Sequence, residues 1–218
     1  MQRTASFDLD KFKLIAGDLS LEFVNTVSGY LRELEAEGRG QAIRGDKFLE
    51  YSDLLAWALK NDIVDEDDAL ALLKRSQREP AAAKSVLKQA VKFRGALYRI
   101  FRSMIVSAKP AAGDLDVLNA EILRARRHQR LIGRGRRLEA VWDTPDTDLG
   151  RPLWPVAVAA GRLLTSDSVS RIKECGGDSC GWLFVDESRG GNRHWCDMRD
   201  CGNVAKVRRF RRKNRGAE

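Results

Sequence analysis

The stretch CGGDSCGWLFVDESRGGNRHWCDMRDC, residues 175–201, decides how the chain is organised, because it holds all four of its cysteines. The cysteines form two C-x4-C pairs with fifteen residues between them. Clustering of this kind indicates a shared site, and two close pairs of thiolates suit a tetrahedral zinc ion. Four protein ligands leave no open coordination position. The sequence therefore predicts one structural Zn²⁺ per chain, bound by Cys175, Cys180, Cys196 and Cys201.

Two other arrangements of these residues are open at this point. Four cysteines allow three disulfide connectivities, and His194 is close enough in sequence to replace one cysteine as a ligand. We favour four thiolates over disulfides, because residues 1–14 contain no apolar export segment and disulfides are rare in a reducing cytosol. We favour them over a histidine ligand, because the paired spacing is complete without His194. We therefore expect a cytoplasmic protein. Within the module, Gly190-Gly191-Asn192 is expected to form the turn between two short strands.

A strongly basic helix is predicted after the last cysteine. Residues 171–218 hold 12 Lys or Arg against 7 Asp or Glu, so much of the net charge of +8 lies there. At about 100° per residue, Val204, Val207 and Phe210 share one arc, which we expect to dock the helix. The other arcs are cationic and predict contacts with phosphate, and Arg208 and Arg212 are the expected guanine contacts. The predicted nucleic-acid-binding residues are Arg193, Lys206, Arg208, Arg209, Arg211, Arg212, Lys213 and Arg215.

Residues 1–168 predict an α-dominated domain. A first helix is expected to be capped by Asp18 or Gly17, carry Val27 and Tyr30 on its apolar face, and end at Gly38 or Gly40. Apolar residues at helical spacing indicate further helices over 54–59, 65–73, 80–105, 114–122 and 153–164. Alternation around a Gly-rich turn predicts a hairpin over 128–142. The expected fold class is mainly α with a small β-hairpin: a helical N-terminal domain over 1–168, then a zinc-stabilised hairpin and helix over 169–218.

Composition and motifs rank the possible functions of the protein. The chain is 43% hydrophobic and 32% charged, which is typical of a globular protein, and no apolar stretch reaches the about 18 residues of a membrane span. His128 and His194 are its two histidines, and neither a Gly-rich phosphate loop nor a catalytic triad is present, so we predict a non-enzyme. A DNA-binding transcription regulator is the first hypothesis. A module for structured RNA or the ribosome is the second, because a cationic helix does not by itself distinguish RNA from DNA. An enzyme with a pocket in the helical domain is the third, and a homodimer is open.

The cysteine-containing module resembles a known family. Cys175, Cys180, the run Arg193-His194-Trp195-Cys196, and Cys201-Gly202-Asn203 followed by a basic helix are similar to the CGNR zinc finger, a bacterial module. The resemblance implies binding of double-stranded DNA and association with the nucleoid. It also implies a mostly helical N-terminal domain called ABATE, found in a family described as stress-induced transcription regulators. Residues 21–26, LEFVNT, resemble the L-D-x-x-N-T motif of that domain.

Two positions depart from the family pattern. Val204 stands where the motif has Arg, so Lys206 or Arg208 is expected to supply the missing contact. Glu22 replaces the usual Asp of the N-terminal motif, in which Glu22, Asn25 and Thr26 are the candidate ligand-binding or structural residues. Polar groups within an apolar helix need partners, and we expect Asn25 and Thr26 to bond to a neighbouring backbone. The resemblance implies that the helical domain senses a signal, such as a small-molecule effector.

Overall fold

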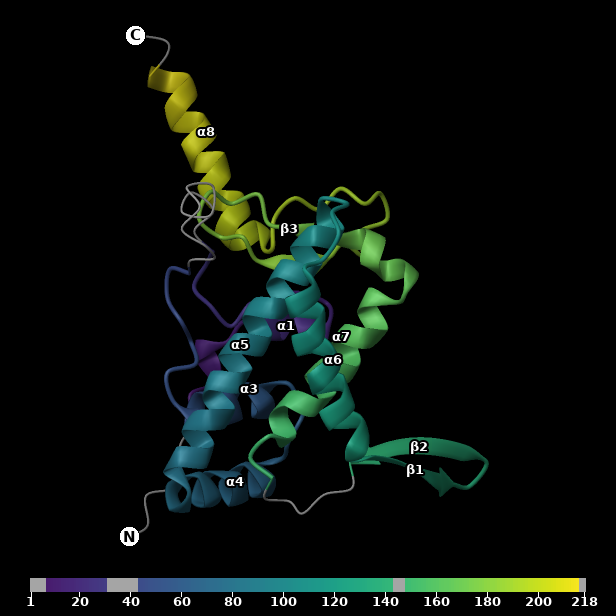
Figure 1. Cartoon of the computed structure of the whole chain (residues 1–218). Coiled ribbons are helices and arrows are strands. Elements are labelled where there is room, and N and C mark those ends of the chain that lie inside the picture. Colours follow the sequence, from purple (N-terminus) through teal and green to yellow (C-terminus); the bar gives the residue numbers. More distant parts are fainter. Residues whose placement is uncertain (1–6, 31–42, 143–147, 216–218) are drawn as a thin grey trace.

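The computed structural model describes residues 7–30, 43–142 and 148–215, which form seven α-helices and two two-stranded sheets. In Figure 1, α5 (Pro80–Ile105) and α6 (Ala112–Arg127) run side by side, and α7 (Trp154–Leu164) packs against α6. Helices α3 (Tyr51–Lys60) and α4 (Glu66–Arg78) lie near one end, and α8 (Asn203–Arg215) projects from the other. The predicted mainly α fold class is confirmed. Within the described ranges, no helix is long and apolar enough to span a membrane.

Helices α4 and α5 begin where the sequence predicts. The Asp65 side chain accepts a hydrogen bond from the Asp68 backbone N at 2.8 Å and caps α4. Pro80 occupies the first turn of α5, where its missing N–H costs nothing. The apolar stripe of α5 includes Phe93, which lies fully buried with its ring 5.7 Å from that of Phe23 in α1 (Leu19–Val24). This aromatic packing joins α5 to α1 in the core of the helical part.

The first helix is shorter than predicted. Asp18 caps it as expected, with its side chain accepting from the Ser20 backbone N, but the helix ends at Val24. Val27 and Tyr30 then form isolated antiparallel bridges with Asp46 and Ile43. The predicted helix over these positions is therefore wrong, and its expected end at Gly38 or Gly40 lies outside the described residues.

Tertiary contacts explain why the chain leaves the helix there. The hydroxyl of Thr26 donates to the Phe23 carbonyl at 2.7 Å, and the ring of Tyr30 stacks on that of Tyr98 with centroids 3.6 Å apart. Arg94 of α5, only 4% exposed, donates to both carboxylate oxygens of Asp46 and to the Thr26 carbonyl. The apolar residues at helical spacing thus belong to an extended segment, which Arg94 and Tyr98 hold against α5.

Both sheets are antiparallel hairpins. Strands β1 (Gln129–Arg134) and β2 (Arg137–Trp142) lie where a hairpin was predicted. Strands β3 (Ile172–Glu174) and β4 (Leu183–Val185) pair across the Cys175–Cys180 loop. Gly190-Gly191-Asn192 lies at a turn after β4, in which the Gly191 backbone N donates to the Ser188 carbonyl, but this turn does not join two strands of the described residues, so its predicted place in a hairpin is wrong. The short helical turns are η1 (Leu9–Lys11), η2 (Arg151–Leu153), η3 (Asp167–Arg171) and the π-turn η4 (Met198–Gly202).

Candidate metal centre and basic helix

The four cysteines converge on one point. Their Sγ atoms all lie within 4.8 Å of one another, and Cys196 Sγ is 3.6 Å from the Sγ atoms of both Cys180 and Cys201. A disulfide needs about 2.05 Å between sulfurs, and all four thiols are free. Zinc–sulfur bonds of about 2.3 Å in a tetrahedron place the sulfurs roughly 3.8 Å apart. The cluster therefore fits a tetrahedral metal ion and does not fit the disulfide alternative.

Backbone geometry positions the first pair of cysteines. Cys175 directly follows β3, and its backbone N donates to the Trp182 carbonyl at 2.7 Å, so the pair closes the end of the β3–β4 hairpin. Gly181, next to Cys180, has φ +63°, and a Cβ there would lie 2.8 Å from Cβ of Tyr30. Glycine is required at this position both by the left-handed backbone and by the close approach of the helical part.

The second pair connects the cluster to α8. Cys196 lies in the loop after β4, and its backbone N donates to Cys175 Sγ at 3.3 Å, a bond that favours a thiolate at Cys175. Cys201 lies in the π-turn η4, which runs directly into α8. Asp197 caps this turn by accepting from the Arg199 backbone N at 2.7 Å. Metal binding by Cys201 would therefore fix the base of α8.

The thiols influence one another's ionisation. Hydrogen bonds from the Cys180 and Cys196 thiols lower the pKa of Cys175 far below its usual range. The same interaction with Cys175 raises the pKa of Cys196, because a second negative charge would lie within bonding distance of the first. A divalent cation removes this repulsion, because thiolates are the form that binds metal. The crowding of four thiols at this point thus favours a cation.

Arg193 lies apart from the predicted phosphate-binding residues. Its guanidinium group donates to the backbone carbonyls of Ile15, Trp195 and Cys196 and stands 4.1 Å from the ring centroid of Phe184. These contacts join the cysteine loop to the segment before α1. The Nε and Nη2 donors of Arg193 therefore bind protein carbonyls and join these two segments, and its place among the nucleic-acid-binding residues stays a prediction.

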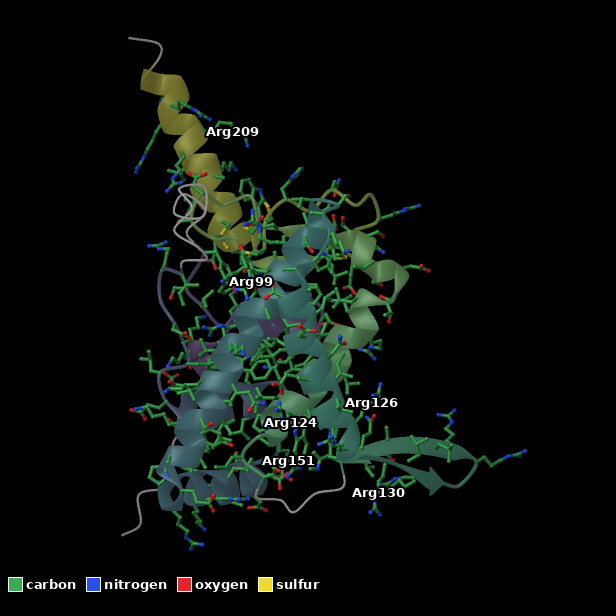
Figure 2. All side chains as sticks on the ribbon, in the orientation of Figure 1. Arg99, Arg124, Arg126, Arg130, Arg151 and Arg209 are labelled. Atoms are coloured by element: carbon green, nitrogen blue, oxygen red, sulfur yellow. The ribbon has the colours of Figure 1, made fainter. Side chains whose placement is uncertain are left out.

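Helix α8 exposes those of the other predicted basic residues whose side chains the structure describes. The side chains of Lys206, Arg208, Arg209, Arg211 and Arg212 are exposed, whereas those of Lys213 and Arg215 lie outside the described part. Figure 2 shows α8, with Arg209 labelled, extending away from the body of the protein. The apolar residues do not dock as predicted. Val204, Val207 and Phe210 are 51%, 48% and 64% exposed. The prediction failed because the helix leaves the module after its first turn.

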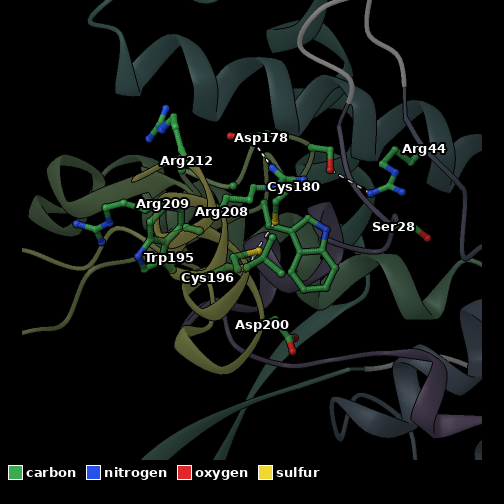
Figure 3. A pocket seen from close by; sticks show the side chains of 17 residues that line it. Ser28, Arg44, Asp178, Cys180, Trp195, Cys196, Asp200, Arg208, Arg209 and Arg212 are labelled. Carbon is green, nitrogen blue, oxygen red and sulfur yellow. Dashed lines mark hydrogen bonds and ion pairs between the residues drawn. The ribbon is translucent and has the colours of Figure 1, made fainter. Parts of the chain in front are cut away.

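A groove of about 700 Å³ lies beside the cysteine cluster, between the start of α8 and the segment that follows α1. Figure 3 shows Arg44 and Ser28 on one side of it and Arg208, Arg209 and Arg212 on the other. Arg208 pairs with Asp178 of the first cysteine loop, and Arg44 donates to the Ser179 hydroxyl at 3.1 Å. No local sequence pattern marks Arg44, which was therefore not among the predicted site residues.

The cysteine module and the helical part share an interface. Asn25, 3% exposed, donates from Nδ2 to the Leu183 carbonyl at 2.8 Å and accepts from the Leu183 backbone N at 3.0 Å. Trp182 Nε1 donates to the Val27 carbonyl, and the Tyr30 backbone N donates to the Cys180 carbonyl. The core is continuous across this interface, with Leu183, Phe184 and Val185 all buried in it. Asn25 and Thr26 thus bond to backbone groups, and the division at residue 168 stays a prediction.

Glu22 supports the same interface from within α1. Its Oε1 accepts from the Ala16 backbone N at 2.5 Å, and the Ala16 carbonyl in turn accepts from the Val185 backbone N at 2.8 Å. Burial raises the pKa of Glu22 from 4.5 to about 7, because desolvation outweighs the backbone N–H groups of residues 15–17 that favour the charged form. The Asp18 carboxylate nearby raises it further.

This raised pKa predicts that Glu22 makes the fold less stable as pH increases. The folded state binds the Glu22 proton more tightly than the unfolded state, so stability falls between about pH 4.5 and 7 and stays low above it. The full effect is about 3 kcal/mol. Glu22→Gln keeps the acceptor for Ala16 and removes the charge. The variant is expected to be more stable than the original protein at pH 8 by up to this amount, and equally stable at pH 4, as measured by urea unfolding.

Two family models match the chain. One, for the CGNR zinc finger, covers residues 171–214. The other, ABATE, described as "Putative stress-induced transcription regulator", covers residues 17–167, more than half of the chain. The chain belongs to the ABATE family. The ABATE match includes Glu22, Asn25 and Thr26, and the zinc-finger match includes all four cysteines and most of α8. The resemblance seen in the sequence is confirmed, with its two parts in the expected order. No curated protein matches the chain.

The family assignment agrees with the geometry of the site. An ABATE protein with a CGNR zinc finger fits a regulatory role, and both matched families are regulatory or zinc-finger types. The clustered sulfurs are the ligands that a zinc finger needs. His194 is exposed and lies outside the cluster of metal-binding side chains found in the described residues. The alternative of a histidine ligand is therefore not supported.

Proposed function

We propose that this ABATE protein is a DNA-binding transcription regulator, in which one structural Zn²⁺ per chain holds α8 in position to contact the phosphate backbone. The observation that carries the proposal is the placement of α8. Its base joins the four-cysteine cluster through Cys201, and its described basic side chains are exposed, with Arg208 also paired to Asp178. Zinc bound by four sulfurs supplies folding free energy and no reactive position. The role of the metal is therefore to orient the helix.

The charge and shape of α8 support duplex DNA as the partner. The major groove accommodates one α-helix, and the exposed basic residues of α8 lie on both sides of its apolar stripe. Lysine and arginine beside the groove would neutralise phosphates. The exposed Val204, Val207 and Phe210 would then face base edges, where apolar side chains contact the thymine methyl group, in place of the guanine contacts predicted for Arg208 and Arg212. This explains why an apolar stripe is exposed on α8.

Salt dependence tests the proposal directly. If α8 neutralises about four to six phosphates, the logarithm of the affinity for a duplex falls with the logarithm of salt concentration with a slope of about −4 to −5. The double variant Arg209→Glu/Arg211→Glu is expected to bind about 100-fold more weakly and to reduce the slope by about two, because two charged contacts of about 1.5 kcal/mol each are lost. Fluorescence anisotropy with a random duplex over a salt series measures both values.

The matched control places the same charge change elsewhere. Lys84→Glu/Lys88→Glu alters two exposed residues of α5, far along the chain from the cysteine module. This control is expected to retain nearly the full affinity. An equal loss of DNA affinity in both double variants would show that the effect depends only on the net charge of the protein. Retained DNA binding by the α8 variant, with loss of binding to structured RNA, would favour the RNA-binding alternative instead.

The ABATE region is proposed to regulate α8 through the shared interface. The segment after α1 contacts the cysteine loop through the hydrogen bonds of Tyr30 to Cys180 and of Trp182 to Val27. Before α1, Lys13 forms ion pairs with Asp197 and Asp200 at the base of α8. These carboxylates raise the pKa of Lys13 to about 12 and keep it charged. A signal that moves the segment around α1 would therefore reach the base of the proposed DNA-binding helix.

A further inference from the structure

The β1–β2 hairpin projects from the helical body. In Figure 1 it extends away from the base of α6, on a different side of the molecule from α8. Every residue from 130 to 140 is exposed. The direction of the hairpin is fixed at its base by the ring of Trp154. The His128 ring stacks on it with centroids 4.2 Å apart, and the centroid of the Trp142 ring lies 5.9 Å from it. The hairpin is thus an anchored arm.

The two faces of this arm differ in chemistry. Directly paired residues of antiparallel strands share a face. Leu131 pairs with Ala140 and Gly133 with Leu138, which makes one face apolar, and Leu131 and Leu138 are 67% and 72% exposed. The opposite face is mixed, with Arg130 opposite Val141, Ile132 opposite Glu139 and Arg134 opposite Arg137. An isolated two-stranded hairpin is marginally stable in water, so an arm with an open apolar face indicates a partner.

The charge of the hairpin indicates which class of molecule it binds. Between residues 124 and 137 the chain has seven arginines, no lysine and no acidic residue. Two neighbouring carboxylates offset this charge: Glu121 pairs with Arg124, and Glu139 pairs with Arg134. Figure 2 shows Arg126 and Arg130 at the base of the arm, so the cationic region continues onto α6. A second copy of the arm would bring equal positive charge into contact, which opposes self-association. The positive charge of the arm is therefore best matched by a polyanion.

We propose that the β1–β2 hairpin is a second DNA-contacting arm, which enters a groove of the duplex with its arginines on phosphate and with Leu131 and Leu138 against the bases. A two-stranded ribbon fits the major groove, and groove-binding proteins commonly combine arginine with apolar wedges. Arginine also binds phosphate through two parallel bonds, which lysine cannot form. The inference rests on the proposed function, since it takes DNA as the partner of α8 as well.

Duplex length separates the two contacts. Because α8 and the arm project from different sides, a short duplex of about 15 base pairs, or one and a half helical turns, is expected to bind α8 alone, whereas one of about 60 base pairs is able to reach both. In the full-length, zinc-loaded protein, the triple variant Arg134→Ser/Arg136→Ser/Arg137→Ser is expected to bind the long duplex at least about tenfold more weakly, with a salt slope shallower by two to three. Its affinity for the short duplex should not change. The triple variant Arg78→Ser/Lys84→Ser/Lys88→Ser is the matched control.

Outcomes for the two proposals differ. If the Arg134→Ser/Arg136→Ser/Arg137→Ser variant keeps its affinity for the long duplex, the proposal that the arm contacts DNA is wrong. This holds even if the Arg209→Glu/Arg211→Glu variant loses binding as proposed for α8. Unchanged affinity of the α8 variant, with the arm variant still weaker, overturns the role proposed for α8 and leaves the arm as a DNA contact. Leu131→Ser/Leu138→Ser gives a second test, and is expected to weaken binding to the long duplex without changing the salt slope. If this variant instead converts a dimer to a monomer and keeps its DNA affinity, the apolar face binds a second copy and the proposal is wrong.

Discussion

Replacing Cys180 or Cys201 with Ser is expected to abolish stoichiometric zinc binding and to unfold the cysteine module. Strands β3 and β4 have three residues each and their buried side chains pack on the helical part, whereas the described residues of α8 are almost all exposed, so the cysteine loops and α8 have little apolar burial of their own to replace the metal. Zinc binding to modules of this size supplies about 10 kcal/mol or more of folding free energy. Metal analysis should find one zinc per original chain and far less than one in either variant. Hydrogen exchange in α8 should become fast.

A nearby histidine provides the control for this experiment. His194→Ala removes an exposed imidazole two residues from Cys196 and leaves the four sulfurs in place. This variant is expected to keep one zinc and the exchange protection of α8. Loss of zinc in His194→Ala would show that a histidine ligand had been excluded wrongly. Full zinc content in both cysteine variants would contradict the four-sulfur site.

The helical part should survive the loss of zinc, at some cost in stability. Its aromatic packing around Phe23, Trp57 and Phe93 does not involve the cysteine loops. Leu183 and Phe184, however, are buried in the same core, so an unfolded module would uncover part of α1. Far-ultraviolet circular dichroism of the cysteine variants should therefore keep most of its helical signal, while the melting temperature decreases.

Local rules predicted the elements that local interactions determine. Asp65 caps α4 and Pro80 starts α5 because these residues act within one turn of the backbone. The cysteine cluster followed from spacing alone, because few chemical arrangements use four cysteines within 27 residues. In each of these cases the partner of a residue lies close to it in the sequence, or is another cysteine.

Predictions failed where the partner of a residue is distant in sequence. Val27 and Tyr30 have helical spacing, but Arg94 and Tyr98 hold their segment in an extended form. Arg193 has partners that the sequence did not indicate, namely backbone carbonyls that include the one of Ile15. No spacing rule carries this information. The exposed stripe of α8 differs, since periodicity located it correctly and only its docking was wrong.

Asn25→Ala is expected to have the second large effect, because it disconnects the helical part from the cysteine module. The Asn25 side chain pairs with the backbone N–H and carbonyl of Leu183 much as a neighbouring strand would. Alanine leaves both of these buried groups without a partner, at about 1–3 kcal/mol each. The free energy of unfolding should therefore decrease by about 3–5 kcal/mol, measured by urea denaturation, and hydrogen exchange of β4 should become faster.

Asn119→Ala is the matched control, because Asn119 is an exposed asparagine of α6. Alanine favours a helix, so this variant should change stability by no more than about 0.5 kcal/mol. If Asn25→Ala behaves like this control, then the two parts are joined by apolar packing alone, and the L-E-x-x-N-T segment has another role. If Asn25→Ala instead binds DNA more weakly than its remaining stability explains, then the interface positions α8, as the proposed regulation of the helix by the ABATE region requires.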